Sequence, residues 1–238
     1  MMRKFVALLG LGLLAILQAG AQEATTPLKT DKDKQSYGIG VQLGTILKAQ
    51  GVDVDSAVVL QGLKDALAGG KLLMTDDELR ATMTALQQQV TQREEAEKAA
   101  AAVNNKKEGD AFLAENKKKD GVVTLASGLQ YKIIKAAVGQ KPTDDDTVLC
   151  QYRGTLLNGT EFDSSYSTGM PATFLVKGLI PGFKEALEQM TVGSTWQFFI
   201  PSELAYGETG AGDAVGPNAT LIFQVELIGI QPPAKPQQ

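Results

Sequence analysis

Hydrophobic positions in the N-terminal part of the chain recur every three or four residues, which is the spacing of amphipathic helices. The first such stripe consists of Tyr37, Val41, Gly44 and Leu47. A second helix is predicted after Asp55, a typical N-cap residue, and Gly69 would end it. A third is predicted to begin at Thr75, where Glu78 completes a capping box. Residues 35–92 are therefore expected to form a helical module.

The third helix is expected to be unusually long. Its apolar stripe ends near Val90, but helix-forming residues continue to about Lys118, with no proline and with Gly109 as the one glycine. A helix over 75–118 would extend about 60 Å at 1.5 Å per residue. Because much of it is too polar to be buried on all sides, we interpret it as a solvated connector between two bodies.

From Gly121 onward the hydrophobic period changes to two residues, which is typical of half-buried strands. Asn158-Gly159 is a strong hairpin-turn signal, and a short helix with Pro181 near its start is predicted before Met190. The expected fold class is α+β: an all-helical N-terminal module, the long connecting helix, and an antiparallel β-sheet wrapped on one short helix over 121–231. A proline-containing tail over 232–238 would follow the sheet.

The first 21 residues are predicted to be a secretory signal peptide. Arg3 and Lys4 precede an apolar stretch over 5–17, and Ala19-Gly20-Ala21 supplies the small residues of a cleavage site. A membrane anchor is disfavoured because a spanning helix needs about 20 apolar residues. We expect the mature protein to begin with a flexible spacer over 22–34 and to reside in the periplasm without a membrane span. Secretion or association with the outer membrane is the alternative.

The composition of the 238-residue chain excludes several kinds of chemistry. It has no histidine, which removes His-based triads, His general bases and nearly all zinc and haem sites. One cysteine, Cys150, excludes an internal disulfide and CxxC motifs, and its place in an alternating segment predicts a buried side chain. A net charge of −4 argues against a nucleic-acid partner. No metal and no cofactor are expected.

What remains as a candidate site is a set of aromatic and aliphatic residues with one carboxylate. The set is Tyr152, Phe162, Asp163, Leu179, Ile180, Phe183, Tyr206 and Phe223. The motifs around these residues resemble those of the FKBP-type peptidyl-prolyl isomerases. They are Tyr152-Arg153-Gly154, residues 158–165, Leu179-Ile180-Pro181-Gly182-Phe183, Met190-Thr191-Val192-Gly193, Leu204-Ala205-Tyr206-Gly207 and residues 218–223. Residues 36–90 are similar to the dimerisation module of the macrophage infectivity potentiator-like branch of that family.

The resemblance implies a peptidyl-prolyl cis-trans isomerase of exported proteins with an apolar proline pocket. Its walls would be Tyr152, Phe162 and Phe223, with Phe183 as the floor. The Ile180 N–H and the Tyr206 hydroxyl would hold substrate carbonyls. Asp163 would interact with the twisted amide carbonyl or position neighbouring groups. Leu179 and Val215 would line the rim.

Such a pocket can work without histidine, nucleophile or metal. Rotating an X–Pro amide costs about 18–20 kcal/mol because the planar form is stabilised by resonance. The twisted state loses that resonance, so its carbonyl is less polar. An apolar pocket that strips water from the amide therefore favours the twisted state over the planar one.

The sequence departs from the resembled family at three pocket positions. Phe183 stands where many members carry tryptophan, and Ala172 and Ala211 stand where many carry an aromatic residue and a histidine. We expect a shallower rim, which leaves open the substrate preference and the affinity for macrolides such as tacrolimus or rapamycin. The expected partners are unfolded or partly folded proline-containing polypeptides and a second copy of the chain in a homodimer with chaperone activity. The alternative is a non-catalytic holdase or client-binding module.

Overall fold

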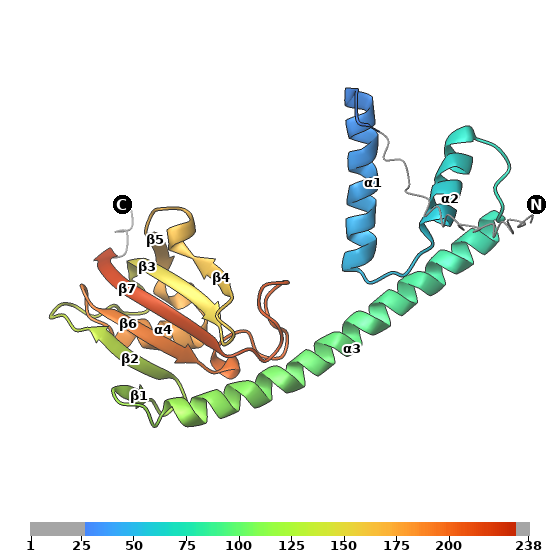
Figure 1. Cartoon of the computed structure of the whole chain (residues 1–238). Coiled ribbons are helices and arrows are strands. Elements are labelled where there is room, and N and C mark those ends of the chain that lie inside the picture. Colours follow the sequence, from blue (N-terminus) through green and yellow to red (C-terminus); the bar gives the residue numbers. More distant parts are fainter. Residues whose placement is uncertain (1–26, 232–238) are drawn as a thin grey trace, which may run out of the picture. The chain divides into compact units, whose positions relative to one another are not determined.

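A computed structural model describes residues 27–231 of the chain (Figure 1). The predicted signal peptide over 1–21, the beginning of the predicted spacer and the tail over 232–238 lie outside these residues. The chain divides into two compact units, one ending at Leu73 and the other beginning at Met74. Within the described residues, no helix has the length and apolar character needed to cross a membrane.

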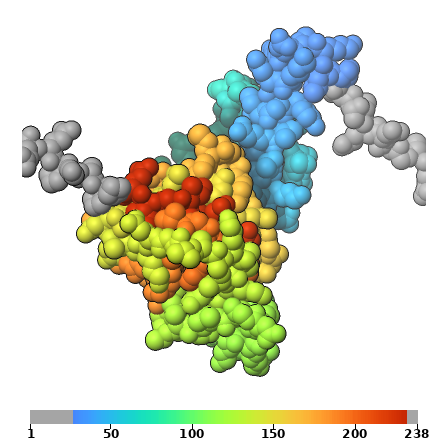
Figure 2. All heavy atoms as spheres, turned by 90° about the vertical axis from the view of Figure 1, so that its left-hand side faces the viewer, coloured from blue at the N-terminus to red at the C-terminus, as the bar shows by residue number. Residues whose placement is uncertain are grey.

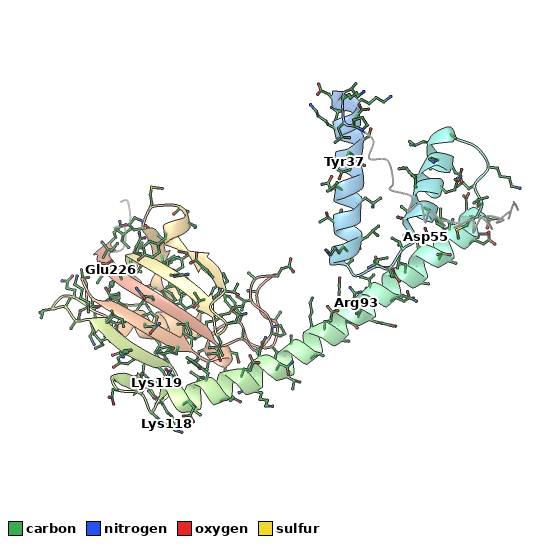
Figure 3. The ribbon with its side chains drawn as sticks, in the orientation of Figure 1. Tyr37, Asp55, Arg93, Lys118, Lys119 and Glu226 are labelled. Atoms are coloured by element: carbon green, nitrogen blue, oxygen red, sulfur yellow. The ribbon has the colours of Figure 1, made fainter. Side chains whose placement is uncertain are left out.

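The first unit contains α1 (Asp31–Ala49) and α2 (Ser56–Ala68). The first helix begins inside the stretch that we expected to be a flexible spacer, because Thr30 and Asp33 form a capping box. The Asp55 carboxylate caps α2 as predicted, and Gly69 ends it with a left-handed φ of 66°. Figure 3 marks Tyr37 on α1 and Asp55 at the start of α2.

Neither helix of the first unit contains a buried residue. Their large apolar side chains are exposed to solvent. On α1 these are Tyr37, Ile39, Val41, Leu43 and Ile46, and on α2 they are Val58, Leu60, Leu63 and Leu67. A segment that buries so little apolar surface gains little hydrophobic stabilisation by itself.

The second unit opens with α3 (Asp76–Asn116), a helix of 41 residues that begins at the predicted Thr75–Glu78 capping box. Its last third is not a solvated connector. Phe112 packs against Phe199 with 5.8 Å between the ring centroids, and the amides of Asn116 and Gln130 form a buried hydrogen bond of 3.0 Å. The end of α3, green in the space-filling view of Figure 2, lies against the sheet domain.

The sheet domain is an antiparallel sheet of seven strands, which confirms the expected α+β class. The strands are β1 (Val122–Thr124), β2 (Gln130–Lys135), β3 (Thr147–Leu156), β4 (Glu161–Ser164), β5 (Ala172–Leu175), β6 (Thr195–Ile200) and β7 (Leu221–Gln231). Their order is β1-β2-β6-β7-β3-β4, and β5 pairs with β3. The alternating pattern did not predict β1 and β5, because strands of three and four residues are too short to show a period.

The core lies between one face of this sheet and α4 (Pro181–Gln189). Phe183 and Leu187 of α4 are buried against residues such as Phe198 on β6. Successive side chains of a strand point to opposite faces, so Phe198 faces the core while Phe199 faces the outside of the sheet, where α3 covers it. Three short 3-10 helices complete the domain: η1 (Ser165–Ser167), η2 (Val176–Gly178) and η3 (Ser202–Leu204).

Candidate active site

Aromatic rings from four strands surround Phe183 of α4. Its ring centroid lies 4.9 Å from that of Phe223, 5.7 Å from Phe198, 6.2 Å from Phe174 and 6.4 Å from Tyr152. The interplanar angles run from 65° to 90°, which is the edge-to-face arrangement that aromatic pairs favour. The N-terminal half of α4 thus supplies the central ring of an apolar cluster.

A glycine on β3 makes room for one wall of this cluster. Gly154 lies opposite Phe223 in the ladder with β7 and opposite Asp163 in the ladder with β4. A Cβ atom on Gly154 would lie 2.7 Å from the ring of Phe223 and 2.8 Å from that of Phe162. With no side chain there, Phe162 and Phe223 pack edge to face with 5.4 Å between their centroids.

The cluster is buried at its base and open at one side. Phe183 is 3% exposed, whereas Tyr206 is 39% exposed, Asp163 is exposed, and Phe162 and Ile180 are half-buried. The structure therefore brings apolar rings together beneath a polar, accessible edge. Such a site can surround a small apolar ring and contact polar groups next to it.

The two residues expected at the rim differ in burial. Leu179 is half-buried beside Ile180. Val215 is 3% exposed and packs into the core, and its backbone N–H and carbonyl pair with those of Ala211.

Ile180 provides an available backbone donor at the start of α4. Its carbonyl accepts hydrogen bonds of 3.0 Å from the N–H groups of Phe183 and Lys184, which fixes the residue as the N-cap. Its own N–H has no acceptor among residues 27–231. Pro181 then begins the helix at a position where the backbone N–H would have no partner within the helix, so the lack of this group in proline costs nothing. A half-buried N–H without a partner is a natural binding point for a ligand carbonyl.

Two serines hold the strand segment that carries Tyr152. The Tyr152 N–H donates to Ser165 Oγ at 2.9 Å, and that hydroxyl donates to Gln151 Oε1 at 2.6 Å. Ser164 Oγ accepts from the Tyr166 N–H, which caps η1. Because Ser164 and Ser165 directly follow Asp163, these bonds fix the end of β4 and Tyr152 relative to each other.

The Tyr152 hydroxyl remains protonated over a wide pH range. Burial is the largest cause of its raised pKa, and the nearby Asp163 carboxylate and Tyr206 raise it further. Burial likewise raises the pKa of the Cys150 thiol to about 12, so this fully buried cysteine is not a nucleophile. Within the described residues, no cluster of three His, Cys, Asp or Glu side chains is arranged to hold a metal ion.

Comparison with known proteins identifies the family. Residues 138–228 match the family described as "FKBP-type peptidyl-prolyl cis-trans isomerase", and residues 32–133 match the "domain amino terminal to FKBP-type peptidyl-prolyl isomerase". The "Outer membrane protein MIP" of Legionella longbeachae is 46% identical over 218 residues, which are 92% of this chain and 94% of the relative. The chain belongs to the FKBP-type peptidyl-prolyl isomerases.

Two further relatives support this identification and confirm the resemblance seen in the sequence. The "Peptidyl-prolyl cis-trans isomerase Mip" of Coxiella burnetii is 44% identical, with 97% of this chain and 99% of the relative covered. The crystal structure of FkpA from Escherichia coli is similar with a TM-score of 0.68 and 36% identity. The structural match covers 87% of this chain and 100% of the FkpA chain.

Sequence reasoning missed three residues of the candidate site. Phe174 was missed because β5 is too short to show a period, although an aromatic residue beside a pocket motif is a usable signal. Gly154 and Ser165 both lie in the quoted motifs, but their roles depend on partners on other strands. The predicted residues Tyr152, Phe162, Phe183 and Phe223 do lie together in the isomerase domain.

Proposed function

We propose that the isomerase rotates X–Pro bonds of exported polypeptides in the pocket above Phe183, and that desolvation is the source of the rate enhancement. The observation that carries this proposal is the buried Phe183 ring at the centre of an edge-to-face aromatic cluster. A proline ring seated on it would bring its own amide bond among apolar side chains. The twisted amide has the less polar carbonyl, so it loses less hydration there than the planar form does.

The polar edge of the pocket would orient the substrate chain. The Ile180 N–H, which has no acceptor within the described part of the chain, and the accessible Tyr206 hydroxyl are suited to hold the carbonyls that flank the proline. Asp163 would interact with the twisted amide carbonyl or position its neighbours. Its effect on the Tyr152 pKa supports an electrostatic link between these groups. Tyr152, Phe162 and Phe223 would form the walls, with Leu179 and Val215 next to them.

We further propose that the chain is a homodimer with chaperone activity. The apolar side chains of α1 and α2 are exposed, and burying them against a second copy would supply the stabilisation that the single unit lacks. Two isomerase domains on one dimer would bind two segments of an unfolded client, which raises the avidity for that client.

Export to the periplasm, with the outer membrane as an alternative site, is the cellular setting that we propose. Two features support it: the basic and apolar start of the sequence, and the name of the Legionella longbeachae relative, "Outer membrane protein MIP". Macrolides such as tacrolimus or rapamycin are proposed ligands of the same aromatic pocket.

Isomerisation of a short X–Pro peptide by the full chain, followed without a coupled protease, tests the catalytic proposal. Uncatalysed exchange takes tens of seconds or longer, so catalysis is easily seen. We expect acceleration that an excess of tacrolimus suppresses. A chain that binds the peptide or an unfolded client without accelerating exchange would instead be the non-catalytic holdase.

A further inference from the structure

The segment after Tyr206 forms a closed loop beside the pocket. The Asn218 N–H donates to the carbonyl of Gly207 at 2.8 Å, and Ala211 pairs with Val215 within the loop. These backbone bonds couple the two ends of residues 206–218. A shift of Asn218 is therefore transmitted to Gly207 and to the adjacent Tyr206.

The long helix α3 holds this loop from the side away from the pocket. Asn105 Nδ2 donates to the carbonyl of Pro217 at 2.8 Å, and Asn218 Nδ2 donates to the carbonyl of Ala102 at 3.4 Å. Both bonds join residues more than 100 positions apart in the sequence. Asn105 is half-buried, so its bond is less exposed to competition from water than a surface contact would be.

These side-chain bonds act together with close packing at Gly216, where an added Cβ would lie 3.1 Å from Asn105 Nδ2. A crevice of about 90 Å³ lies next to these contacts, between α3, the turn that follows β3 and the end of the loop, and its lining includes Asn105, Asn158 and Gly216. Asn218 adopts a positive φ of 54°, alone among the non-glycine residues that the structure describes. Asparagine adopts this left-handed conformation readily, and the bonds to Gly207 and Ala102 hold the residue in place.

We infer that Asn105 of α3 is a positioning residue of the isomerase. Together with Asn218 it fixes the loop that presents Tyr206 to the substrate. The last third of α3 is therefore a structural part of the isomerase domain and supports its active site. This inference rests on the proposed function, in which the Tyr206 hydroxyl holds a substrate carbonyl.

Asn105→Asp tests the inference in the full chain, with Asn104→Asp as the matched control. The first substitution keeps the size of the side chain but removes the N–H donor and directs a carboxylate at the Pro217 carbonyl. The control makes the same change of charge on the adjacent, exposed residue of the same helix. Two quantities are measured: kcat and KM for a short X–Pro peptide, and amide hydrogen exchange of residues 207–218 by mass spectrometry.

For Asn105→Asp we expect kcat/KM to fall about fivefold, mainly through KM, because a net hydrogen bond of this kind is worth about 1 kcal/mol. The rate of amide hydrogen exchange of residues 207–218 should rise at least fivefold. Asn104→Asp should change neither kcat/KM nor this exchange rate. Asn218→Gly, which keeps the backbone conformation but loses the bond to Ala102, should shift both quantities in the same direction.

Unchanged loop exchange and unchanged kcat/KM in Asn105→Asp and Asn218→Gly would overturn the inference. Equal losses in Asn105→Asp and Asn104→Asp would also overturn it, because charge alone would then be the cause. Loop exchange is measured without substrate, so it tests Asn105 separately from catalysis. An inactive wild-type chain would contradict the proposed function and not the role of Asn105 in holding the loop.

Discussion

At the scale of single residues, Gly154 allows the rings of Phe162 and Phe223 to pack together because it lacks a side chain. A Cβ there would displace the rings of Phe162 and Phe223. We expect Gly154→Ala to lower kcat/KM at least tenfold and stability by about 1–3 kcal/mol, the usual range for overpacking. Gly229→Ala is the matched control, because Gly229 is also on the sheet and an added Cβ would meet nothing within 4 Å. Equal activity in both variants would contradict this account of the wall.

Burial of the Cys150 thiol predicts a pH dependence of stability. Its pKa is raised from 9.0 to about 12 in the folded protein. The stabilisation is complete below the unfolded pKa and is lost as pH rises from 9 toward 12, at up to about 1.4 kcal/mol per pH unit. Urea unfolding at pH 8, 9 and 10 measures this slope. Cys150→Ala should flatten the decline between pH 9 and 10, and an identical decline in both proteins would refute the assignment.

At the scale of elements, Gly109 determines how closely α3 approaches the sheet domain. A Cβ there would collide with Thr220 Oγ1. Alanine favours a helix interior over glycine by about 1 kcal/mol, yet we expect Gly109→Ala to destabilise the protein by about 1–3 kcal/mol. Thr220→Ala removes the obstructing oxygen, so the penalty should shrink in the double variant. Chemical denaturation of all four proteins measures the coupling, and strictly additive effects would contradict it.

Helix ends and turns that are determined by neighbouring residues could be predicted from the sequence. The Thr75–Glu78 capping box, the Asp55 cap with Gly69, and the Asn158-Gly159 turn each depend on residues within a few positions. The start of α1 was missed by several residues because the Thr30–Asp33 capping box lies in a stretch with no apolar stripe.

Features that depend on distant partners could not be predicted in the same way. Nothing near Asn105 in the sequence indicates a bond to Pro217, and the clash that excludes a side chain at Gly154 involves two other strands. The aromatic residues Tyr152, Phe162, Phe183 and Phe223, which the structure brings together, could be predicted because family motifs record such long-range contacts. Phe174 lies outside those motifs and was missed.

At the scale of the whole molecule, the exposed apolar faces of α1 and α2 predict a homodimer. Light scattering on the full chain should give twice the mass of one copy. Leu63→Asp would place a charge on the apolar face of α2 and should give a monomer, because burying that charge is costly. Ser56→Asp, which places the same charge on an exposed polar residue in the first turn of the same helix, should remain dimeric. A monomeric wild-type chain would refute the dimer.

The same pair of variants separates catalysis from chaperone activity. Monomeric Leu63→Asp should isomerise a short peptide at the wild-type rate, because the pocket lies within one isomerase domain. It should protect an unfolded client from aggregation less well, because bivalent binding is lost. Protection that is equal in the Leu63→Asp and Ser56→Asp chains would show that chaperone activity does not need the dimer.

The central claim is that the ring of Phe183 forms the floor on which X–Pro bonds rotate, and peptide isomerisation by Phe183→Ala and Trp196→Ala tests it most directly. Both substitutions remove a buried ring and should cost about 3–5 kcal/mol of stability, but the Trp196 ring stacks on Tyr131 of β2 and not on the rings around Phe183. Below the unfolding temperature of both variants, we expect Phe183→Ala to lose at least tenfold in rate, about 1.4 kcal/mol of barrier, and Trp196→Ala to stay within about twofold of wild type. A folded Phe183→Ala chain that isomerises at the wild-type rate, or equal losses in the two variants, would contradict the account.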